Sequence, residues 1–437
     1  MEVVVSAAVL VLVVLGVLAA LDAISSTAGA NRARTVAATL AEKDQERLRG
    51  MTTVSISGYS DTRTVHAAGA DYTVVSKAEW IRDATGETVS CTSQEGQVNY
   101  LRISSTVTSP ATGGRLKPVV ISSLVAPPAG SAGTQGTLAV SVKNAAGLPV
   151  MALPVVLSGA AARVGTTNQE GCAVFSLIPA GTYAVTLNQS GWVDRAFHAV
   201  STKQGVTVTA GNVSTVAMEY DRAASVTVQV ETLKAGATAP VPDASKSVVA
   251  SNSGIQPSGF QVFTTPTEMS TINVGGLFPF TDAYTFYSGA CSGNDPSLYV
   301  PGYFDSNPGS VQLGPGAQGG TIKVREPAIN LRVTRGGNQQ NAPLWSDQRW
   351  SRAKIYPTAA GCEGTDPLVY APLVNGGLAM PGVPFGKYAI CVDDRSFNRR
   401  RTITGINNDD PRGTPQIDLW IDTSSRGERG SCDDWTP

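Results

Sequence analysis

Charged side chains are scarce in this sequence, and their signs almost cancel. Asp, Glu, Lys and Arg make up 15% of the residues, whereas they make up about 25% of an average soluble domain. The formal net charge is −1, so the chain has no excess of basic groups to attract phosphate, and we expect no nucleic-acid partner. Aromatic residues are also few, at 6%, so the cores must be built mostly from small and β-branched side chains. This composition is typical of extracellular β-sandwich proteins.

The sequence also lacks the motifs that mark common catalytic and metal sites. It contains only two histidines, His66 and His198, and its six cysteines include no Cys-x-x-Cys pair. Tetrahedral zinc sites draw on closely spaced Cys and His residues, so we expect no metal site. A Gly-rich phosphate loop, an HExxH motif and a recognisable Ser/His/Asp set are absent as well. We therefore expect no cofactor and no enzyme activity.

What the sequence does contain is one long apolar run near its N-terminus. After Glu2, the residues Val3–Leu21 carry no charge, and the next charged residue is Asp22. About 20 apolar residues in a helix are enough to cross the ~30 Å hydrocarbon core of a bilayer, so the run predicts a membrane-spanning helix. Two alternatives stay open, a cleaved secretory signal and a plain signal anchor. Cleaved signals have a basic start and a shorter apolar stretch of about 7–15 residues.

The helix is predicted to continue past this run as an amphipathic segment that ends near Gly50. Apolar residues recur there at helical spacing and form one stripe: Ala33, Val36, Ala37, Leu40, Ala41 and Leu48. Charged residues cover the remaining surface and form two i,i+3 pairs, Lys43–Glu46 and Asp44–Arg47. Because the residues of the stripe are small, we expect it to pack closely against a sheet or another helix.

Residues 2–50 together resemble the N-terminal helix of type IV pilins and pseudopilins. The resemblance implies a helix that first anchors the subunit in the membrane and later packs in the core of a filament. Glu2 matches the acidic residue near the start of the mature family helix, which is understood to pair with the N-terminal amine of a neighbouring subunit. A carboxylate in an apolar bundle costs about 2.5–3.5 kcal/mol unless a cation meets it, which is consistent with that role. Alternatively, Glu2 simply complements the helix dipole at the membrane interface.

Residues 51–126 predict a small antiparallel sheet, which is also the layout that the pilin resemblance implies. Short stretches bounded by turn residues predict strands at Thr53–Ser57, Tyr72–Ile81, Val98–Val107 and Val119–Val125. The Pro-, Ala- and Gly-rich segment Pro127–Gly133 then has the composition of a linker.

A turn-and-strand motif recurs beyond the linker at a spacing of about 100 residues, the size of one β-sandwich. It occurs at Leu177–Val185, recurs at Leu277–Phe280 with Tyr284–Phe286, and appears again at Val383–Ile390; the first copy is the clearest. We therefore predict three sandwich modules, at residues 134–221, 222–326 and 327–437. The first resembles the transthyretin-like, carboxypeptidase-regulatory and Cna-B modules of secreted proteins. The tyrosine of each copy is expected to anchor a corner of its sandwich.

Aromatic residues gather in the second module, where two interpretations compete. The residues are Phe278, Phe280, Tyr284, Phe286, Tyr287, Tyr299, Tyr303 and Phe304. A carbohydrate-stacking face is conceivable, but several of them alternate along one predicted strand. We therefore expect most of them to lie in the core.

The even number of cysteines favours disulfides formed in an oxidising compartment over buried free thiols. Six cysteines allow 15 pairings, so the sequence alone does not fix the connectivity. Within the predicted modules, we prefer Cys362 with Cys391 inside the third module. Cys172 and Cys291 are then candidates to bridge adjacent modules, and Cys91 and Cys432 have no evident partner.

Taken together, these patterns predict a mainly β protein with one long N-terminal α-helix (residues 1–50). They favour a minor pilin or pseudopilin-like subunit that resides in the cell membrane before assembly. It would then join other pilin subunits in an extracellular filament and display its modules on the surface. In-frame codons upstream of Met1 for the basic leader of family precursors would favour this identification. The alternative is a membrane-anchored surface adhesin that does not polymerise.

Overall fold

The computed structural model describes most of the chain. The described residues are 2–51, 56, 59–82, 91, 98–109, 117–126, 134–233, 239–341, 344, 351–370, 377–409 and 414–437. The predicted strand Thr53–Ser57, apart from Ile56, and the predicted linker Pro127–Gly133 lie outside these residues.

The protein is mainly β, with one long N-terminal helix, as the sequence predicts. Helix α1 spans Glu2–Arg49 and the chain turns at Gly50, so the predicted end of the helix is confirmed. The chain divides into two compact units, which are described separately. Unit 1 comprises Met1–Lys143, Leu148–Asn188 and Thr202–Met218, and unit 2 comprises Asn144–Gly147, Gln189–Ser201 and Glu219–Pro437.

In unit 1, helix α1 is followed in the chain by an antiparallel sheet. Its strands lie in sequence order: β1 (Ser60–Ala67), β2 (Ala70–Arg82), β3 (Val98–Thr108) and β4 (Val119–Val125). The predictions for β2, β3 and β4 are confirmed, whereas β1 was not predicted. Its half-buried positions include the polar residues Asp61 and Arg63, so the alternation of apolar and polar residues that marks a strand is weak there.

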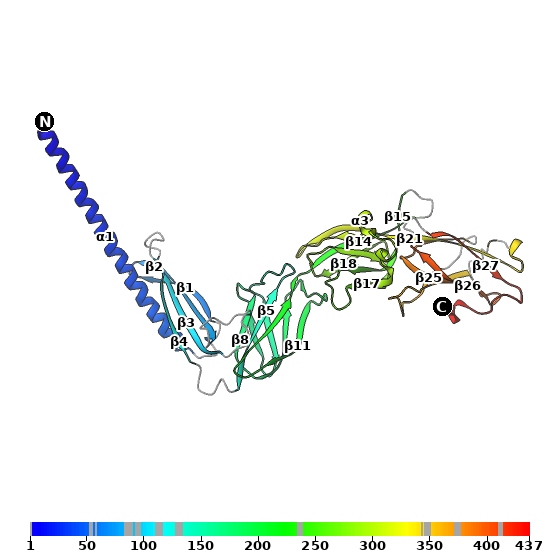
Figure 1. Cartoon of the computed structure of the whole chain (residues 1–437), viewed down its shortest axis with the longest axis horizontal. Coiled ribbons are helices and arrows are strands. Elements are labelled where there is room, and N and C mark those ends of the chain that lie inside the picture. The colour runs from blue at the N-terminus through cyan, green and yellow to red at the C-terminus, as the bar shows by residue number, and fades with distance from the viewer. Residues whose placement is uncertain are drawn as a thin grey trace. The chain divides into compact units, whose positions relative to one another are not determined.

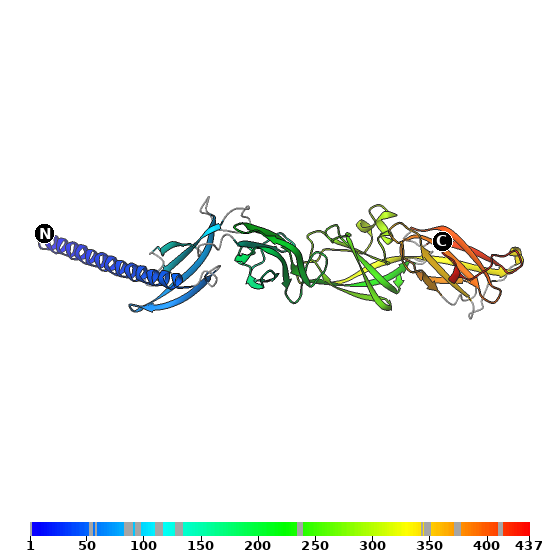
Figure 2. The same cartoon turned by 90° about the horizontal axis from the view of Figure 1, so that it is seen from below.

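The apolar stripe of α1 packs on one face of this sheet. Ala33, Ala37, Ala41 and Leu48 are buried. They contact inward-facing sheet residues, among them Tyr72, Val74, Val107, Trp80, Leu101 and Ile103. Figures 1 and 2 show the C-terminal half of α1 lying against the sheet, while the N-terminal half extends beyond it. The predicted role of the stripe is thus confirmed.

The rest of unit 1 is a β-sandwich. One sheet has the order β11 (Val200–Val208), β9 (Gly181–Asn188), β6 (Pro154–Gly159) and β7 (Arg163–Thr166). The other has the order β12 (Val213–Glu219), β5 (Gln135–Lys143) and β8 (Cys172–Pro179). Ala139, Cys172 and Val213 join the same hydrophobic cluster as Leu48 of α1 and Trp80 of β2. The sandwich and the helix-covered sheet therefore share part of one core.

Unit 2 contains three larger sheets and a short ladder of β10 (Trp192–Val193) with β13 (Asp221–Arg222). The six-stranded sheet contains β14 (Ala224–Leu233), β15 (Val241–Pro242), β18 (Thr271–Leu277), β21 (Gln318–Gly336), β24 (Gly377–Gly382) and β27 (Thr414–Asp422). A second sheet has the order β17 (Phe260–Met269), β16 (Ser245–Ser251), β19 (Tyr284–Ser288) and β20 (Ser310–Val311). The third has the order β23 (Leu368–Tyr370), β22 (Ser351–Pro357), β25 (Gly386–Asp394) and β26 (Arg399–Asn408). Short helices lie at Ser292–Asn294, Pro296–Leu298, Tyr303–Ser306 (α3), Gln339–Asn341 and Cys432–Asp434.

Strand β21 connects two hydrophobic cores within unit 2. Its first half pairs in parallel with β14 beside a core that includes Val228, Val324 and Phe286. Its second half pairs with β24 and β27 beside a core that includes Leu331 and Ile390. We call these the first and second cores of unit 2. The predicted module boundary between residues 326 and 327 falls inside this strand, so three separate tandem sandwiches are not confirmed.

The disulfides differ from the predicted pairs. The structure joins Cys91 to Cys172, Cys291 to Cys362, and Cys391 to Cys432. The pairings Cys362–Cys391 and Cys172–Cys291 are therefore wrong, although the expectation of disulfides is confirmed. Cys362 lies in a turn after β22 that contacts Cys291, and the C-terminal segment that carries Cys432 crosses the face of β25 on which Cys391 lies. The spacing of the cysteines in the sequence does not indicate that Cys291 lies near Cys362 or that Cys391 lies near Cys432.

The repeated tyrosines anchor corners as predicted. The Tyr183 hydroxyl donates to the carbonyl of Pro179, and the Tyr388 hydroxyl donates to that of Pro384, each over 2.8 Å. The Tyr284 hydroxyl likewise donates to the Phe278 carbonyl. Most of the aromatic residues of residues 278–304 are buried, namely Phe278, Phe280, Tyr284, Phe286, Tyr287 and Tyr303, so the prediction that they form core is confirmed.

We expect the variant Tyr183→Phe to lose about 1–2 kcal/mol of unfolding free energy, because the Pro179 carbonyl loses its hydrogen-bond donor at a buried ring. Urea unfolding of the full chain measures the change. Tyr100→Phe is the matched control, because Tyr100 is exposed on β3. Equal losses in the two variants would contradict the corner role.

Candidate assembly surface

The N-terminal half of α1 presents a continuous apolar surface. The large aliphatic side chains described there are 50% to 69% exposed: Leu10, Val11, Leu12, Val13, Val14, Leu15, Val17, Leu18, Leu21 and Ile24. Successive helix residues point about 100° apart, so a run of this kind faces every direction around the axis. Monomeric soluble proteins rarely expose a large contiguous apolar patch unless something else covers it. We call these residues the apolar helix surface.

Over the residues that the structure describes, no helix combines the length and the apolar character that crossing a bilayer requires. Glu2, the predicted assembly residue, belongs to α1, but its side chain lies outside the described residues.

The C-terminal half of α1 is held on its sheet by a buried carboxylate. Asp44 is fully buried and accepts hydrogen bonds from Ser76 Oγ at 2.7 Å and from Ser105 Oγ at 2.6 Å. Arg47 binds the same carboxylate at 2.9 Å, and Arg63 of β1 forms a further ion pair with it. One carboxylate therefore connects α1 with β1, β2 and β3.

Gln45 extends this polar layer to the fourth strand. Its amide nitrogen donates to Ser105 Oγ at 3.1 Å and to the carbonyl of Ile121 at 3.0 Å. Its amide oxygen accepts a hydrogen bond from Ser123 Oγ at 2.8 Å. Because each partner sits at one position on its strand, the layer specifies both the rotation and the axial position of α1.

The ionisation of Asp44 follows from these contacts. Burial by itself raises the pKa of the Asp44 carboxyl, but the hydrogen bonds from Ser105, Ser76 and Arg47 outweigh burial and lower the pKa below its usual value. The carboxylate therefore stays charged across the neutral range, where its hydrogen-bond donors stabilise it.

Two sequence predictions about this segment need correction. Asp44 was expected on the solvent-facing side of the helix, and the structure places it in the interface with the sheet. The predicted pair Asp44–Arg47 is present, but Glu46 pairs with Arg49 at 3.0 Å and not with Lys43. Ser76 and Ser105, which donate hydrogen bonds to Asp44, occupy buried positions on strands whose other buried residues are apolar. These two serines were the feature of the sequence that indicated a polar partner on the helix.

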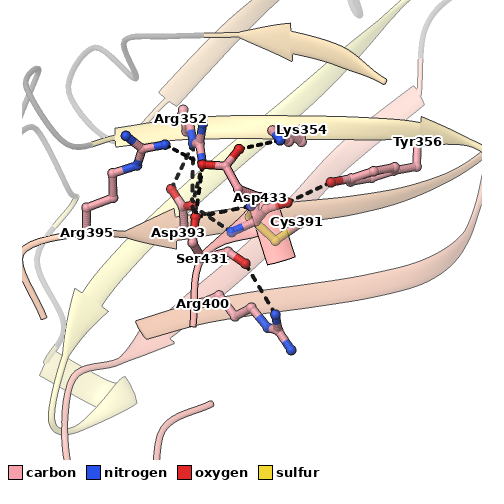
Figure 3. Close-up of polar contacts among 10 residues, drawn as sticks. Arg352, Lys354, Tyr356, Cys391, Asp393, Arg395, Arg400, Ser431 and Asp433 are labelled. Carbon is pink, nitrogen blue, oxygen red and sulfur yellow. Dashed lines mark hydrogen bonds and ion pairs between the residues drawn. A yellow bond between two sulfur atoms is a disulfide. The ribbon is translucent and has the colours of Figure 1, made fainter. Parts of the chain in front are cut away.

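A second polar cluster fixes the C-terminal segment onto the third sheet of unit 2. Figure 3 shows Arg352, Lys354 and Arg395 converging on Asp433. Their nitrogens lie 2.5, 2.6 and 2.7 Å from its carboxylate oxygens. The hydrogen bonds from Arg352 and Lys354 hold the pKa of the Asp433 carboxyl well below its usual range.

The fully buried Asp393 completes this cluster (Figure 3). It accepts hydrogen bonds from the backbone nitrogen of Cys432 at 2.7 Å and from Ser431 Oγ at 2.9 Å, and it pairs with Arg352 at 3.1 Å. The Cys391–Cys432 disulfide lies directly beside it. Every group here is paired with another, so the cluster acts as a clamp and offers no free nucleophile or base.

The described residues offer little that resembles a catalytic or metal centre. No group of three or more His, Cys, Asp or Glu residues within them is arranged to hold a metal ion. A cavity of about 200 Å³ in unit 2 is lined by Arg195, among other residues. That guanidinium is paired with Glu219 at 3.0 Å and lies over the ring of Phe280. The apolar helix surface is therefore the strongest candidate for a functional site.

Comparisons with known proteins add only weak likenesses. No protein-family model and no curated protein matches the chain. Among solved structures, the chain is similar to the TIE protein of Bacillus anthracis, with 12% identity, 85% of this chain and 75% of that chain covered, and a TM-score of 0.21. It is similar to GBS52, the minor pilin of Streptococcus agalactiae, with 15% identity, coverage of 44% and 95%, and a TM-score of 0.21. It is also similar to BcpA, the major pilin subunit of Bacillus cereus, with 8% identity, coverage of 66% and 100%, and a TM-score of 0.19.

We expect Asp44→Asn to destabilise the packing of α1 by about 3 kcal/mol, because the two arginines then face each other around a neutral amide. The folded-state pKa of Asp44 is lowered, so its contribution to stability is present above the unfolded pKa of 3.8 and is lost as the pH falls below that value. The helical circular dichroism signal during urea unfolding at pH 7 and pH 3 measures both effects. Glu42→Gln, at an exposed position of the same helix, is the control. A loss in Asp44→Asn that is as large at pH 3 as at pH 7 would contradict this account.

Replacing Cys391 and Cys432 together by Ser should release the C-terminal segment. The disulfide closes a loop with a sequence separation of 41 residues, which corresponds to about 4 kcal/mol of chain entropy. We expect trypsin to cleave faster at the exposed Arg426 and Arg429 than in wild type. Mass spectrometry of the digest over time measures the cleavage rate. The variant with Cys91 and Cys172 replaced by Ser, in unit 1, should leave this cleavage rate unchanged. If both double variants are cut at the wild-type rate, the disulfide is not part of the clamp.

Proposed function

We propose that this chain is a structural subunit of a filament of the type IV pilus kind, a minor pilin or pseudopilin-like protein. The observation that carries the proposal is the apolar helix surface, which is exposed on every side although the same helix is buried further along. In the assembled state, this surface would pack against the equivalent surface of other copies or of related subunits. Before assembly, a lipid bilayer would cover it.

The energetics favour an external partner for this surface. Full burial of a Val, Leu or Ile side chain contributes roughly 1.5–3 kcal/mol relative to leaving it exposed. Ten such side chains are exposed here, so lateral packing of several helices would outweigh the entropy lost on association. We propose that Glu2 meets a cation there, such as the N-terminal amine of a neighbouring copy, because an unpaired carboxylate is costly in an apolar bundle.

The β-rich parts of the chain would lie on the filament exterior. The disulfides and the paired clamp around Asp433 suit an oxidising, extracellular setting. The role proposed is structural, and no reaction is assigned to the chain.

The variant Leu15→Lys tests the proposal. A lysine buried in an apolar helix bundle costs about 3 kcal/mol, so we expect roughly a hundredfold loss of filaments in sheared surface material, counted by electron microscopy. The fold should be unaffected, because Leu15 is 57% exposed. The control is Val164→Lys, since Val164 is a 72% exposed apolar residue on β7.

Two outcomes would count against the proposal. Filaments that form equally well with Leu15→Lys would remove α1 from the assembly contact. A wild-type chain that stays at the cell surface and forms no filament would favour the non-polymerising adhesin instead.

A further inference from the structure

Unit 2 contains a buried carboxyl group at the point where β21 passes from one core to the other. Pro327 is the last residue of β21 paired with β14, and Ala328 is the first paired with β24. We call this crossing the seam. Glu326 immediately precedes it, and its side chain is only 1% exposed. A buried carboxyl group needs a partner for each oxygen or a proton of its own.

The neighbours of Glu326 come from both sides of the seam. Ser288, at the end of β19, donates a hydrogen bond to one of its oxygens. Asp243, which precedes β16, accepts a hydrogen bond from the backbone nitrogen of Gly382 at the end of β24. A Cβ atom built on Gly382 would lie 2.7 Å from Glu326 Oε2 and 2.9 Å from Asp243 Oδ2. Both carboxyl groups therefore lie next to the same backbone position of β24, Gly382.

Two acidic groups act to raise the pKa of Glu326, namely Asp243 and, from β17, the exposed Glu268. Hydrogen bonds from the hydroxyls of Ser288 and Ser245 act in the opposite direction. Burial and the neighbouring acidic groups both favour the neutral form of Glu326, so Glu326 keeps a proton. A protonated carboxyl group then donates a hydrogen bond to its neighbour.

We propose that Glu326 and Asp243 form a proton-held latch across the seam, closed while Glu326 keeps its proton and open once that proton is lost. In the closed state, the Glu326 O–H donates to the Asp243 carboxylate, which in turn accepts from Gly382 of β24. Opening transfers the Glu326 proton to solvent and breaks this hydrogen bond. The two adjacent negative charges then push the segment before β16 away from β21 and β24.

Other contacts across the seam, among the residues that the structure describes, are made by a disulfide and by amide groups. The Cys291–Cys362 disulfide joins the segment after β19 to the turn after β22. The Asn294 amide donates to the carbonyl of Phe385 at 2.8 Å, and the Val383 nitrogen donates to that of Pro327 at 2.9 Å. Opening of the latch would therefore loosen one side of the seam while the other side stays joined.

The pH range in which the latch opens follows from the burial of Glu326. Burial, together with the charge of Asp243, raises its pKa from 4.5 to about 8. Because the folded-state pKa is raised, the stability that the neutral form provides is complete below pH 4.5 and is lost as the pH rises to 8. The latch is thus closed in a neutral or mildly acidic medium and opens in an alkaline one.

The variant Glu326→Gln tests the latch, because the amide has the same shape and hydrogen-bond donor but cannot ionise. Thermal and urea unfolding of the full oxidised chain are compared at pH 5 and pH 8.5. Between pH 5 and pH 8.5, we expect the folding equilibrium constant of wild type to fall by up to roughly a thousandfold more than that of the variant. Glu170→Gln, at an exposed position of unit 1, should show no such gain. The same difference between Glu326→Gln and wild type at both pH values would overturn the proposal.

A direct titration covers the case in which Glu326→Gln fails to fold. Wild-type chain labelled with carboxyl-¹³C glutamate should show one glutamate resonance that titrates near pH 8. In Asp243→Asn, this midpoint should fall towards 4.5, because one of the two acidic neighbours is gone. If every glutamate of the folded wild-type chain titrates between about pH 3 and 6, Glu326 holds no proton at neutral pH and there is no latch.

Discussion

The arrangement of unit 1 depends on one constraint: the N-terminal half of α1 is apolar, and the described residues of the chain do not cover it. An exposed aliphatic surface of this extent is unfavourable in water, so its position must be controlled until a partner covers it. The chain does this by burying the other half of the same helix. Small residues such as Ala37 and Ala41 let α1 approach the sheet closely, and Leu48 adds a larger contact at the end. The apolar helix surface is therefore held in place by the C-terminal half of α1, which is itself part of a core.

A purely apolar interface between α1 and its sheet would leave the axial position of the helix poorly determined. Alanines spaced a turn apart make similar contacts after a shift of one turn. The buried layer of Asp44 and Gln45 removes this ambiguity, since their hydrogen-bond partners occupy single positions on β2, β3 and β4. Buried ion pairs often contribute little net stability, because desolvation offsets the attraction. We infer that this layer specifies one register at modest gain in stability. The proposed filament, built by lateral packing of α1, would need that specificity, since every subunit would have to present the apolar surface at the same height.

The sequence allowed a large part of this architecture to be predicted, and the failures have a common physical origin. Helix α1, its apolar stripe, strands β2 to β4 and the corner tyrosines depend on local periodicity or on a short motif, both of which are visible in a single sequence. Strand β1 was missed because its inward positions include Arg63, whose role is defined only by Asp44 on the distant helix. The burial of Asp44 was missed for the same reason. The disulfides and the passage of β21 through two cores depend on contacts between distant segments, and no periodicity records them. The apolar helix surface was recognisable from the sequence, whereas the side chains that fix its register were not.

Strand β21, which belongs to both cores of unit 2, also changes how this unit resists a pulling force. A force that separates the two cores acts along the covalent backbone of β21 and through the Cys291–Cys362 disulfide, and it cannot part them at a flexible linker as it could in a string of independent modules. To release the strand, the force must shear the ladder with β14 on one side of the seam or the ladder with β27 on the other, and both ladders are parallel. Shearing breaks many hydrogen bonds at once, whereas peeling breaks them singly, so β21 holds the cores together more firmly than a loop would. Glu326 lies one residue before the end of the ladder with β14, and the ladder with β27 begins only at Ile329. A change of one proton beside this junction can therefore alter the contact between the cores without unpairing the strand.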